Sequence, residues 1–198
     1  MRRLSHYLRA LESFTDAPGG TVSSEELASR GSTTAAQVRK DLSHFGSFGK
    51  RGLGYNVAEL RDRLRSILGV DRVWSVALVG AGRIGRALFE YPDFRARGYH
   101  CVAILDVDPE KVGAAWGDTE IRPISELEDV IRSLSVDLVV LAVPGSAAQD
   151  IADRAVECGV RGLLNFAPVQ LRVPSDVPVE DVNLVMELEA LSFQITQG

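Results

Sequence analysis

Residues 74–85 read Trp74-Ser75-Val76-Ala77-Leu78-Val79-Gly80-Ala81-Gly82-Arg83-Ile84-Gly85, and this stretch decides the fold of most of the chain. An apolar strand runs directly into a GxGxxG turn, which predicts a helix that begins near Arg83. In such a turn the first glycine allows the bend, the second lets a pyrophosphate approach the backbone, and the third lets helix pack on strand. The helix amides then hold the anion. Residues 80–85 therefore predict a dinucleotide-binding site.

A second predicted strand, residues 99–105, ends in Asp106, 21 residues beyond Gly85. A carboxylate at this spacing can accept hydrogen bonds from the hydroxyls of an adenosine ribose. It would repel a 2′-phosphate, so the spacing favours NAD(H) over NADP(H). The alternative is that Asp106 only caps the turn that follows it.

Helices and apolar strands continue to alternate further along the chain. The predicted elements are a helix over 125–134, a strand over 137–143, a helix over 147–158 and a strand over 162–165. This order predicts an α/β Rossmann domain with a parallel, doubly wound sheet over residues 71–180. Ligands of such sheets lie at the carboxyl ends of the strands. Val143-Pro144 and Asn165-Phe166 are therefore candidates for a nicotinamide pocket.

The chain before residue 70 is more positively charged than the rest. Up to Leu68 it contains 11 Lys and Arg against 7 Asp and Glu, whereas the remainder contains 11 against 20. The first part is thus near +4 in a chain whose formal net charge is −5. Such asymmetry indicates a surface that meets a polyanion, and ordinary charge scatter is the alternative.

Short helices are predicted in this part over 4–14, 23–31, 34–46 and 59–68. The second and third of them, separated by a few residues, predict a helix-turn-helix. At helical spacing the third helix turns Val38, Leu42 and Phe45 inward, and its opposite face carries Ala36, Lys40, Ser43 and His44. We expect Lys40 and Ser43 to approach base edges and Arg39 to reach a phosphate. The alternative is a solvated helix face.

Residues 48–55, Phe48-Gly49-Lys50-Arg51-Gly52-Leu53-Gly54-Tyr55, predict a hairpin with a basic tip. Three glycines surround two adjacent cations, and aromatic residues at both ends can anchor strands. A helix-turn-helix followed by a basic hairpin is a winged helix, whose wing contacts the backbone or the minor groove of DNA. We therefore predict a winged-helix DNA-binding domain over residues 1–70, with Lys50, Arg51 and Gly52 at the tip of the wing.

Several other classes of function are not expected. No apolar stretch is long enough for a membrane span and no signal sequence is evident, so we expect a cytoplasmic protein. Cys101 and Cys158 have no spacing that would hold a metal. His100 stands at the start of its strand, at the edge opposite the cofactor, so no proton-transfer group is evident beside a nicotinamide. A small NAD-dependent oxidoreductase with a basic accessory domain remains the alternative.

The last residues, 181–198, predict an amphipathic helix with too much apolar surface for one partner. One stripe carries Leu184, Val185, Leu188, Leu191 and Ile195, and Val182, Met186 and Phe193 extend it. Such a helix suits insertion into another subunit, and packing on the protein's own sheet is an equally open alternative.

With these motifs in order, the chain resembles the Rex family of redox-sensing repressors over nearly its whole length. The segments that carry the resemblance are Tyr7-Leu8-Arg9, 23–27, 37–43, 49–55, 106–113 and 164–168. The resemblance implies a homodimer with exchanged C-terminal helices that binds operator DNA and releases it when NADH binds. It also implies that Lys40 enters the major groove and that Lys50 and Arg51 form the wing.

The resemblance further implies a polar switch. It assigns Tyr91 to the nicotinamide of NADH and Arg9 to a network with Tyr91 and an acidic residue of the other subunit. This chain has Asn183 at the acidic position. An amide can accept a hydrogen bond but cannot form an ion pair with Arg9, so either the switch is weaker than the resemblance implies or its third member is another residue.

Overall fold

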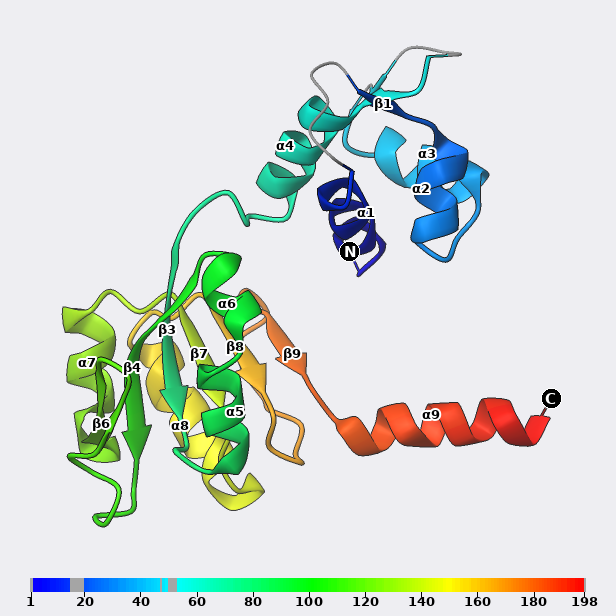
Figure 1. The fold of residues 1–198 in the computed structure, drawn as a ribbon. Helices are drawn as coiled ribbons and strands as arrows, with labels where there is room; N and C mark the ends of the chain where they lie inside the picture. The colour runs from blue at the N-terminus through cyan, green and yellow to red at the C-terminus, as the bar shows by residue number, and fades with distance from the viewer. Residues whose placement is uncertain (1, 15–19, 47, 50–52, 198) are drawn as a thin grey trace. The chain divides into compact units, whose positions relative to one another are not determined.

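Two compact units, residues 1–72 and 73–198, make up the chain in the computed structural model (Figure 1). The structure describes residues 2–14, 20–46, 48–49 and 53–197. The division falls after Arg72, whereas the sequence analysis expects it after residue 70. Each unit has hydrophobic core residues of its own, so each is described by itself.

The first unit combines helices with one short antiparallel ribbon. Its elements are α1 (Arg2–Glu12), β1 (Thr21–Val22), α2 (Ser24–Arg30), α3 (Ala35–Ser43), β2 (Tyr55–Asn56) and α4 (Val57–Ile67). Side chains cap the helices where the sequence predicts: Ser23 and Glu26 form the capping box of α2, and Thr34 caps α3. α2 and α3 follow one another closely, as in the expected helix-turn-helix.

One core holds this unit together. Its fully buried side chains include Tyr7, Leu8, Leu11, Leu27, Leu42, Leu60 and Leu64. β1 pairs with β2, with Val22 opposite Tyr55. The sequence analysis did not predict β1, because two residues are too few to show alternation. The second arm of the expected hairpin thus pairs with β1, and the tip at Lys50, Arg51 and Gly52 lies outside the described residues.

The second unit is built on a seven-stranded sheet with the order β5-β6-β4-β3-β7-β8-β9. The strands are β3 (Trp74–Val79), β4 (Tyr99–Asp106), β5 (Ala115–Trp116), β6 (Thr119–Pro123), β7 (Leu138–Leu141), β8 (Gly162–Asn165) and β9 (Val179–Asp181). Neighbours are parallel except β5, which is antiparallel to β6. Counted along the chain, the parallel strands have the order 3-2-1-4-5-6 of dinucleotide-binding sheets.

Helices cover both faces of this sheet, which is why the central strands β3 and β7 are mostly apolar. These helices are α5 (Arg83–Phe89), α6 (Pro92–Ala96), the 3-10 turn η1 (Ile124–Glu126), α7 (Leu127–Ser133) and α8 (Gly145–Glu157), whereas the last helix, α9 (Leu184–Gln197), extends away from the sheet (Figure 1). In β3, Ala77 and Val79 pack in the core that α7 and α8 share. Val76 and Leu78 point to the other face and belong to the cluster that receives α5.

The C-terminal helix starts later than expected. The sequence analysis begins it at Asp181, but Asp181 pairs with Asn165 as the last residue of the parallel strand β9. α9 begins at Leu184, and Asn183 accepts hydrogen bonds from its first turn. Its apolar side chains are exposed in the single chain. Among the described residues, no helix has the length and apolarity that crossing a bilayer requires.

Candidate functional site

Three glycines at the end of β3 have the backbone roles that the motif predicts. Gly80 has a φ of +106°, and a Cβ there would collide with the carbonyl of Ala142. A Cβ on Gly85 would collide with the carbonyl of Gly80, so α5 packs closely on the strand. A Cβ on Gly82 would meet nothing within 4 Å. The turn is therefore open at Gly82, where a pyrophosphate can approach.

An open groove of about 600 Å³ lies beside this turn. Its lining is Ala81, Gly82, Arg83, Arg86, Ala87, Glu90, Lys111 and Trp116. No side chain caps α5 at Gly82, so the first amides of the helix are not used by a capping group. Arg83 and Ile84 are exposed, and the Arg86 guanidinium lies 5.0 Å from the Trp116 ring centre. The cations and the free amides suit an anionic ligand.

Asp106 ends β4 and braces the glycine turn. Its Oδ2 accepts from the N–H of Ala81 at 2.6 Å, and its Oδ1 accepts from the N–H of Asp108 at 2.9 Å. Lys111 Nζ is 3.4 Å from Oδ2. Burial opposes ionisation, but these donors outweigh it and hold the pKa of Asp106 below its ordinary value. The carboxylate therefore holds both the glycine turn and the turn at Asp108, and these donors use three of its roughly four acceptor positions.

The loops after β7 and β8 lie side by side at the same edge of the sheet. The N–H of Phe166 donates to the carbonyl of Leu141 at 2.8 Å. Val143 and Pro144 lie in the loop that follows β7, and Pro144 is the N-cap residue of α8. The structure thus brings the expected nicotinamide loops together with the glycine turn.

Asn165 shapes this edge from within. Its side chain is buried, and Nδ2 donates to the carbonyl of Val169 at 2.8 Å and to Asp181 Oδ1 at 2.7 Å. Its Oδ1 accepts from the N–H of Ala167 at 2.9 Å. The side chain is therefore engaged within the protein and ties the loop to β9. Contact with a ligand here is left to backbone groups and to Phe166.

The three residues of the implied switch are distributed over both units. Arg9 is exposed in the last turn of α1. Tyr91 precedes α6, is 48% exposed, and meets Phe94 edge-on at 5.6 Å. Asn183 Oδ1 accepts from two backbone N–H groups in the first turn of α9, at 3.0 and 3.3 Å. Its oxygen is thus used as a helix cap, which sequence reasoning did not predict.

On α3, the inward and outward faces agree with the expected helical spacing except at the end. Val38 and Leu42 are buried, and Lys40 and Ser43 are exposed. Phe45, expected inward, is 40% exposed because the helix ends at Ser43 and its periodicity no longer holds. The outward face therefore carries Lys40 as an exposed cation.

Arg39 is engaged inside the helix-turn-helix. One of its guanidinium nitrogens donates to Ser24 Oγ at 2.8 Å and lies 3.4 Å from Glu25 Oε1. The expected phosphate contact would compete with these bonds. In this structure Arg39 ties α3 to α2.

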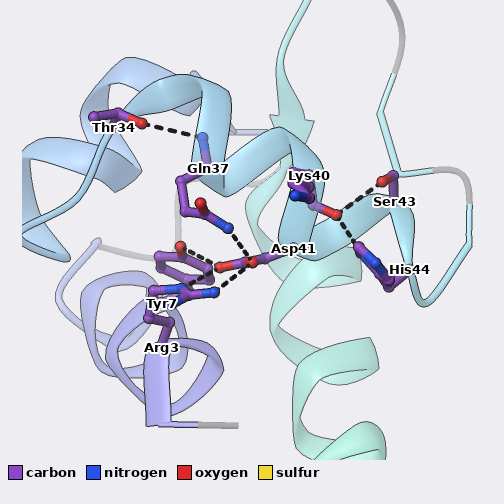
Figure 2. A network of polar contacts seen from close by, with 8 residues as sticks. All are labelled: Arg3, Tyr7, Thr34, Gln37, Lys40, Asp41, Ser43 and His44. Carbon is purple, nitrogen blue, oxygen red and sulfur yellow. Dashed lines mark hydrogen bonds and ion pairs between the residues drawn. The ribbon is translucent and has the colours of Figure 1, made fainter.

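A polar cluster around Asp41 joins α3 to α1, and the sequence analysis missed it (Figure 2). Arg3 donates through Nε and Nη2 to the two carboxylate oxygens at 2.6 and 2.9 Å. The Tyr7 hydroxyl donates at 2.9 Å, and Gln37 Nε2 donates at 2.6 Å. The Arg3 hydrogen bonds are the largest cause that holds the pKa of Asp41 well below its ordinary range, and burial opposes them.

The Asp41 cluster is only weakly predictable from the sequence. Arg3 and Tyr7 stand four residues apart on one helix, as Gln37 and Asp41 do on another. Arg3 and Asp41 are 38 residues apart in the sequence. Helical periodicity gives no information about contacts between residues that far apart.

Groups that could bind a metal or react as a thiol are the His, Cys, Asp and Glu side chains of the described residues. No cluster of three His, Cys, Asp or Glu side chains able to hold a metal occurs there. Burial raises the pKa of the Cys101 thiol to about 11, so it is protonated near neutral pH.

Family models match both units. The "CoA binding domain" model matches residues 71–169, and a model of the N-terminus of DNA-binding proteins matches residues 1–43. The redox-sensing transcriptional repressor Rex of Carboxydothermus hydrogenoformans is 47% identical over 193 residues, covering 98% of this chain and 93% of that protein. The Rex repressor of Thermotoga petrophila is 46% identical, covering 99% and 94%.

Solved structures of a related protein are similar to this chain over nearly its whole length. The crystal structure of RSP in complex with β-NAD+ and operator DNA has a TM-score of 0.93 and 37% identity, covering 99% of this chain and 90% of that one. RSP in complex with β-NADH has a TM-score of 0.88 and 36% identity, covering 99% and 92%.

Proposed function

This chain belongs to the Rex family of redox-sensing transcriptional repressors, and on that basis we propose that it binds operator DNA through α3 while NADH is scarce and releases it when NADH binds. The protein binds NAD(H) and operator DNA, and it is a repressor rather than an enzyme. One observation on the residues of this chain supports the proposal most directly. A cation-bearing helix-turn-helix and an open dinucleotide turn occur in one chain, in separate units.

Lys40 and Ser43 read base edges in the major groove, since they stand on the exposed face of α3. Lys50, Arg51 and Gly52 contact the sugar-phosphate backbone as the tip of a wing, and their cations support that role. Arg39 reaches a phosphate only by giving up its bonds to Ser24 and Glu25.

NAD(H) binds along the glycine turn. Its pyrophosphate accepts hydrogen bonds from the backbone amides at Gly82 and Arg83, and its adenosine ribose donates to the Asp106 carboxylate. Its nicotinamide lies near Val143, Pro144 and Phe166. The glycine turn lies within residues 71–169, which match the family model of a coenzyme A-binding domain. Coenzyme A carries a phosphate on its adenosine ribose, which the Asp106 carboxylate would repel, so this chain favours NAD(H).

Redox discrimination follows from the charge of the nicotinamide. The oxidised ring is a cation and the reduced ring is neutral. Burying an unpaired cation costs several kcal/mol, and about 1.4 kcal/mol is tenfold in affinity. An apolar pocket near Phe166 and Tyr91 therefore favours NADH by roughly 100-fold or more. Calorimetric titration of both forms tests this step, and equal dissociation constants would exclude it.

The repressor is a homodimer with exchanged α9 helices. The large apolar side chains of α9 are 52–72% exposed in the single chain, namely Leu184, Val185, Met186, Leu188, Leu191, Phe193 and Ile195. Such a stripe calls for a partner surface. Tyr91, 48% exposed, likewise needs a second surface if it is to help bury a nicotinamide.

Arg9, Tyr91 and Asn183 form the switch. Because Asn183 Oδ1 caps α9, only the amide N–H groups of that side chain remain for the network. These groups can donate to the Tyr91 hydroxyl, but not to Arg9, which is itself a donor.

The proposal is tested by selecting duplexes that the protein binds in NAD+ and titrating NADH into the complexes. A specific operator that is bound in NAD+ and released by NADH supports it. Turnover of a 2-hydroxy acid or an aldehyde would support the oxidoreductase alternative instead.

A further inference from the structure

We propose that Asp41 is the positioning residue that fixes α3 for operator reading, by anchoring this helix to α1 through Arg3 and Tyr7. The inference rests on the DNA-binding function proposed above. It adds to that function residues that need not touch DNA.

The Asp41 carboxylate is fully used inside the domain (Figure 2). A carboxylate has about four acceptor positions, and Arg3, Tyr7 and Gln37 supply four donors to it. The Arg3 contact is bidentate, which sets direction as well as distance. The Asp41 side chain is only 13% exposed. Asp41 therefore binds side chains of α1 and has no acceptor position left for a DNA base.

This anchor supplies something that the core does not. α1 packs closely on α2 and α4, and α3 packs closely on α2. Val38 and Leu42 hold α3 by apolar burial, which is non-directional and tolerates small rotations of the helix about its axis. Lys40 and Asp41 are neighbours on that helix, so a rotation that breaks the Asp41 bonds moves Lys40 as well. The polar cluster thus sets the angle at which Lys40 faces the groove.

The anchor also joins α3 to the helix that carries Arg9. Both Arg3 and Arg9 lie on α1. A displacement of α1 at Arg9 is therefore passed to α3 through a rigid contact, whereas a loose contact would absorb it.

For the substitution Asp41→Asn, electrostatics alone and the positioning role predict opposite changes in the affinity for operator DNA. Asp41→Asn removes a negative charge from the helix that reads a polyanion, so charge alone would tighten DNA binding. It also removes the bidentate partner of Arg3, so positioning predicts weaker operator binding. Asp62→Asn is the matched control, because Asp62 lies in the same unit on α4 and its side chain is 76% exposed.

The experiment measures dissociation constants for the selected operator and for a non-operator duplex of equal length at one salt concentration. We expect Asp41→Asn to weaken operator binding about tenfold, which is about 1.4 kcal/mol, and to leave non-operator binding equal or tighter. Asp62→Asn keeps the wild-type ratio of the two constants. NADH affinity stays unchanged in both variants. A loss of stability alone would lower both DNA affinities together, so the ratio separates positioning from a general structural role.

Tyr7→Phe is the second variant, and it keeps the charge. It removes one donor from Asp41 and leaves a buried ring of the same shape, so we expect the operator to non-operator ratio to fall about threefold. An unchanged ratio in folded Tyr7→Phe, or tighter operator binding by Asp41→Asn, would overturn the inference. Wild-type protein that binds no duplex specifically would instead overturn the proposed function.

Discussion

Lys40 is exposed on the outward face of α3, where the sequence analysis expects it. Ser43 Oγ donates back to the Lys40 carbonyl at 2.8 Å, and His44 Nδ1 lies 2.6 Å from the same oxygen. The polar side chains of Ser43 and His44 thus contact the backbone at the end of α3, whereas the Lys40 side chain is an exposed cation on the outward face.

Lys40→Ala is expected to weaken operator binding by roughly 10- to 100-fold, since a base contact contributes about 1–3 kcal/mol. NADH binds in the other unit, so its affinity should not change. Fluorescence anisotropy with labelled operator and calorimetry with NADH measure the two quantities. Joint loss of both affinities would argue against separate modules.

Asn183 is the residue at which this chain departs from the implied switch. Asp is as good a helix cap as Asn, so Asn183→Asp preserves the first turn of α9. Its second carboxylate oxygen can then pair with Arg9, which the amide cannot do. We expect operator release at an NADH concentration several-fold lower than in wild type.

Asn183→Ser is the control for that change, because serine caps a helix without adding charge. NADH titration of the operator complex should give a midpoint no lower than that of wild type for this variant, because serine adds no charge for Arg9 and lacks the amide N–H groups that Asn183 offers to Tyr91. Equal shifts in Asp and Ser variants would show that the cap, and not the charge, sets the midpoint.

At the scale of elements, long periodic segments were predictable and short ones were not. The strand at 74–79 and the helices at α2 and α3 follow from apolar spacing and caps within each segment. β1, β5 and β9 have two or three residues each, and they exist because neighbouring strands pair with them. Asp181 was placed in a helix for this reason, since its pairing with Asn165 is not visible in local periodicity.

The same distinction divides the functional residues. The glycine turn and Asp106 were predictable because a motif fixes their spacing along the chain. The Asp41 cluster and the Asn165–Asp181 contact were not, because each joins residues that are distant in sequence.

Helices α7 and α8 are tied by a bidentate contact that should make stability depend on pH. Arg154 donates to both Glu128 oxygens at 2.6 and 3.0 Å, and these hydrogen bonds lower the pKa of Glu128 to about 2. A lowered folded-state pKa adds stability above the ordinary glutamate pKa, and this stability is lost as pH falls towards 2.

Glu128→Gln should therefore reduce the free energy of unfolding by about 1 kcal/mol at neutral pH, because the pair is partly exposed. The deficit should be constant from pH 6 to 8 and shrink below about pH 4.5. Asp129→Asn, at an exposed position of the same helix, is the control. Denaturant titrations across this range measure it, and a deficit that does not shrink in acid would contradict the pKa shift.

In the whole molecule, we propose that the DNA-binding unit and the NADH-binding unit are coupled by thermodynamic linkage. A dimer that reads a two-fold operator must hold its recognition helices about 34 Å apart, one turn of DNA. NADH releases DNA only if it binds the DNA-incompetent arrangement better than the competent one. By the same coupling, operator DNA must weaken NADH binding by an equal factor.

The most direct test is the NADH dissociation constant, measured by calorimetry with and without saturating operator. We expect NADH to bind the operator complex more weakly than the free protein, by the same factor by which NADH weakens operator binding. An NADH affinity that is identical with and without operator would contradict the coupling between the two units.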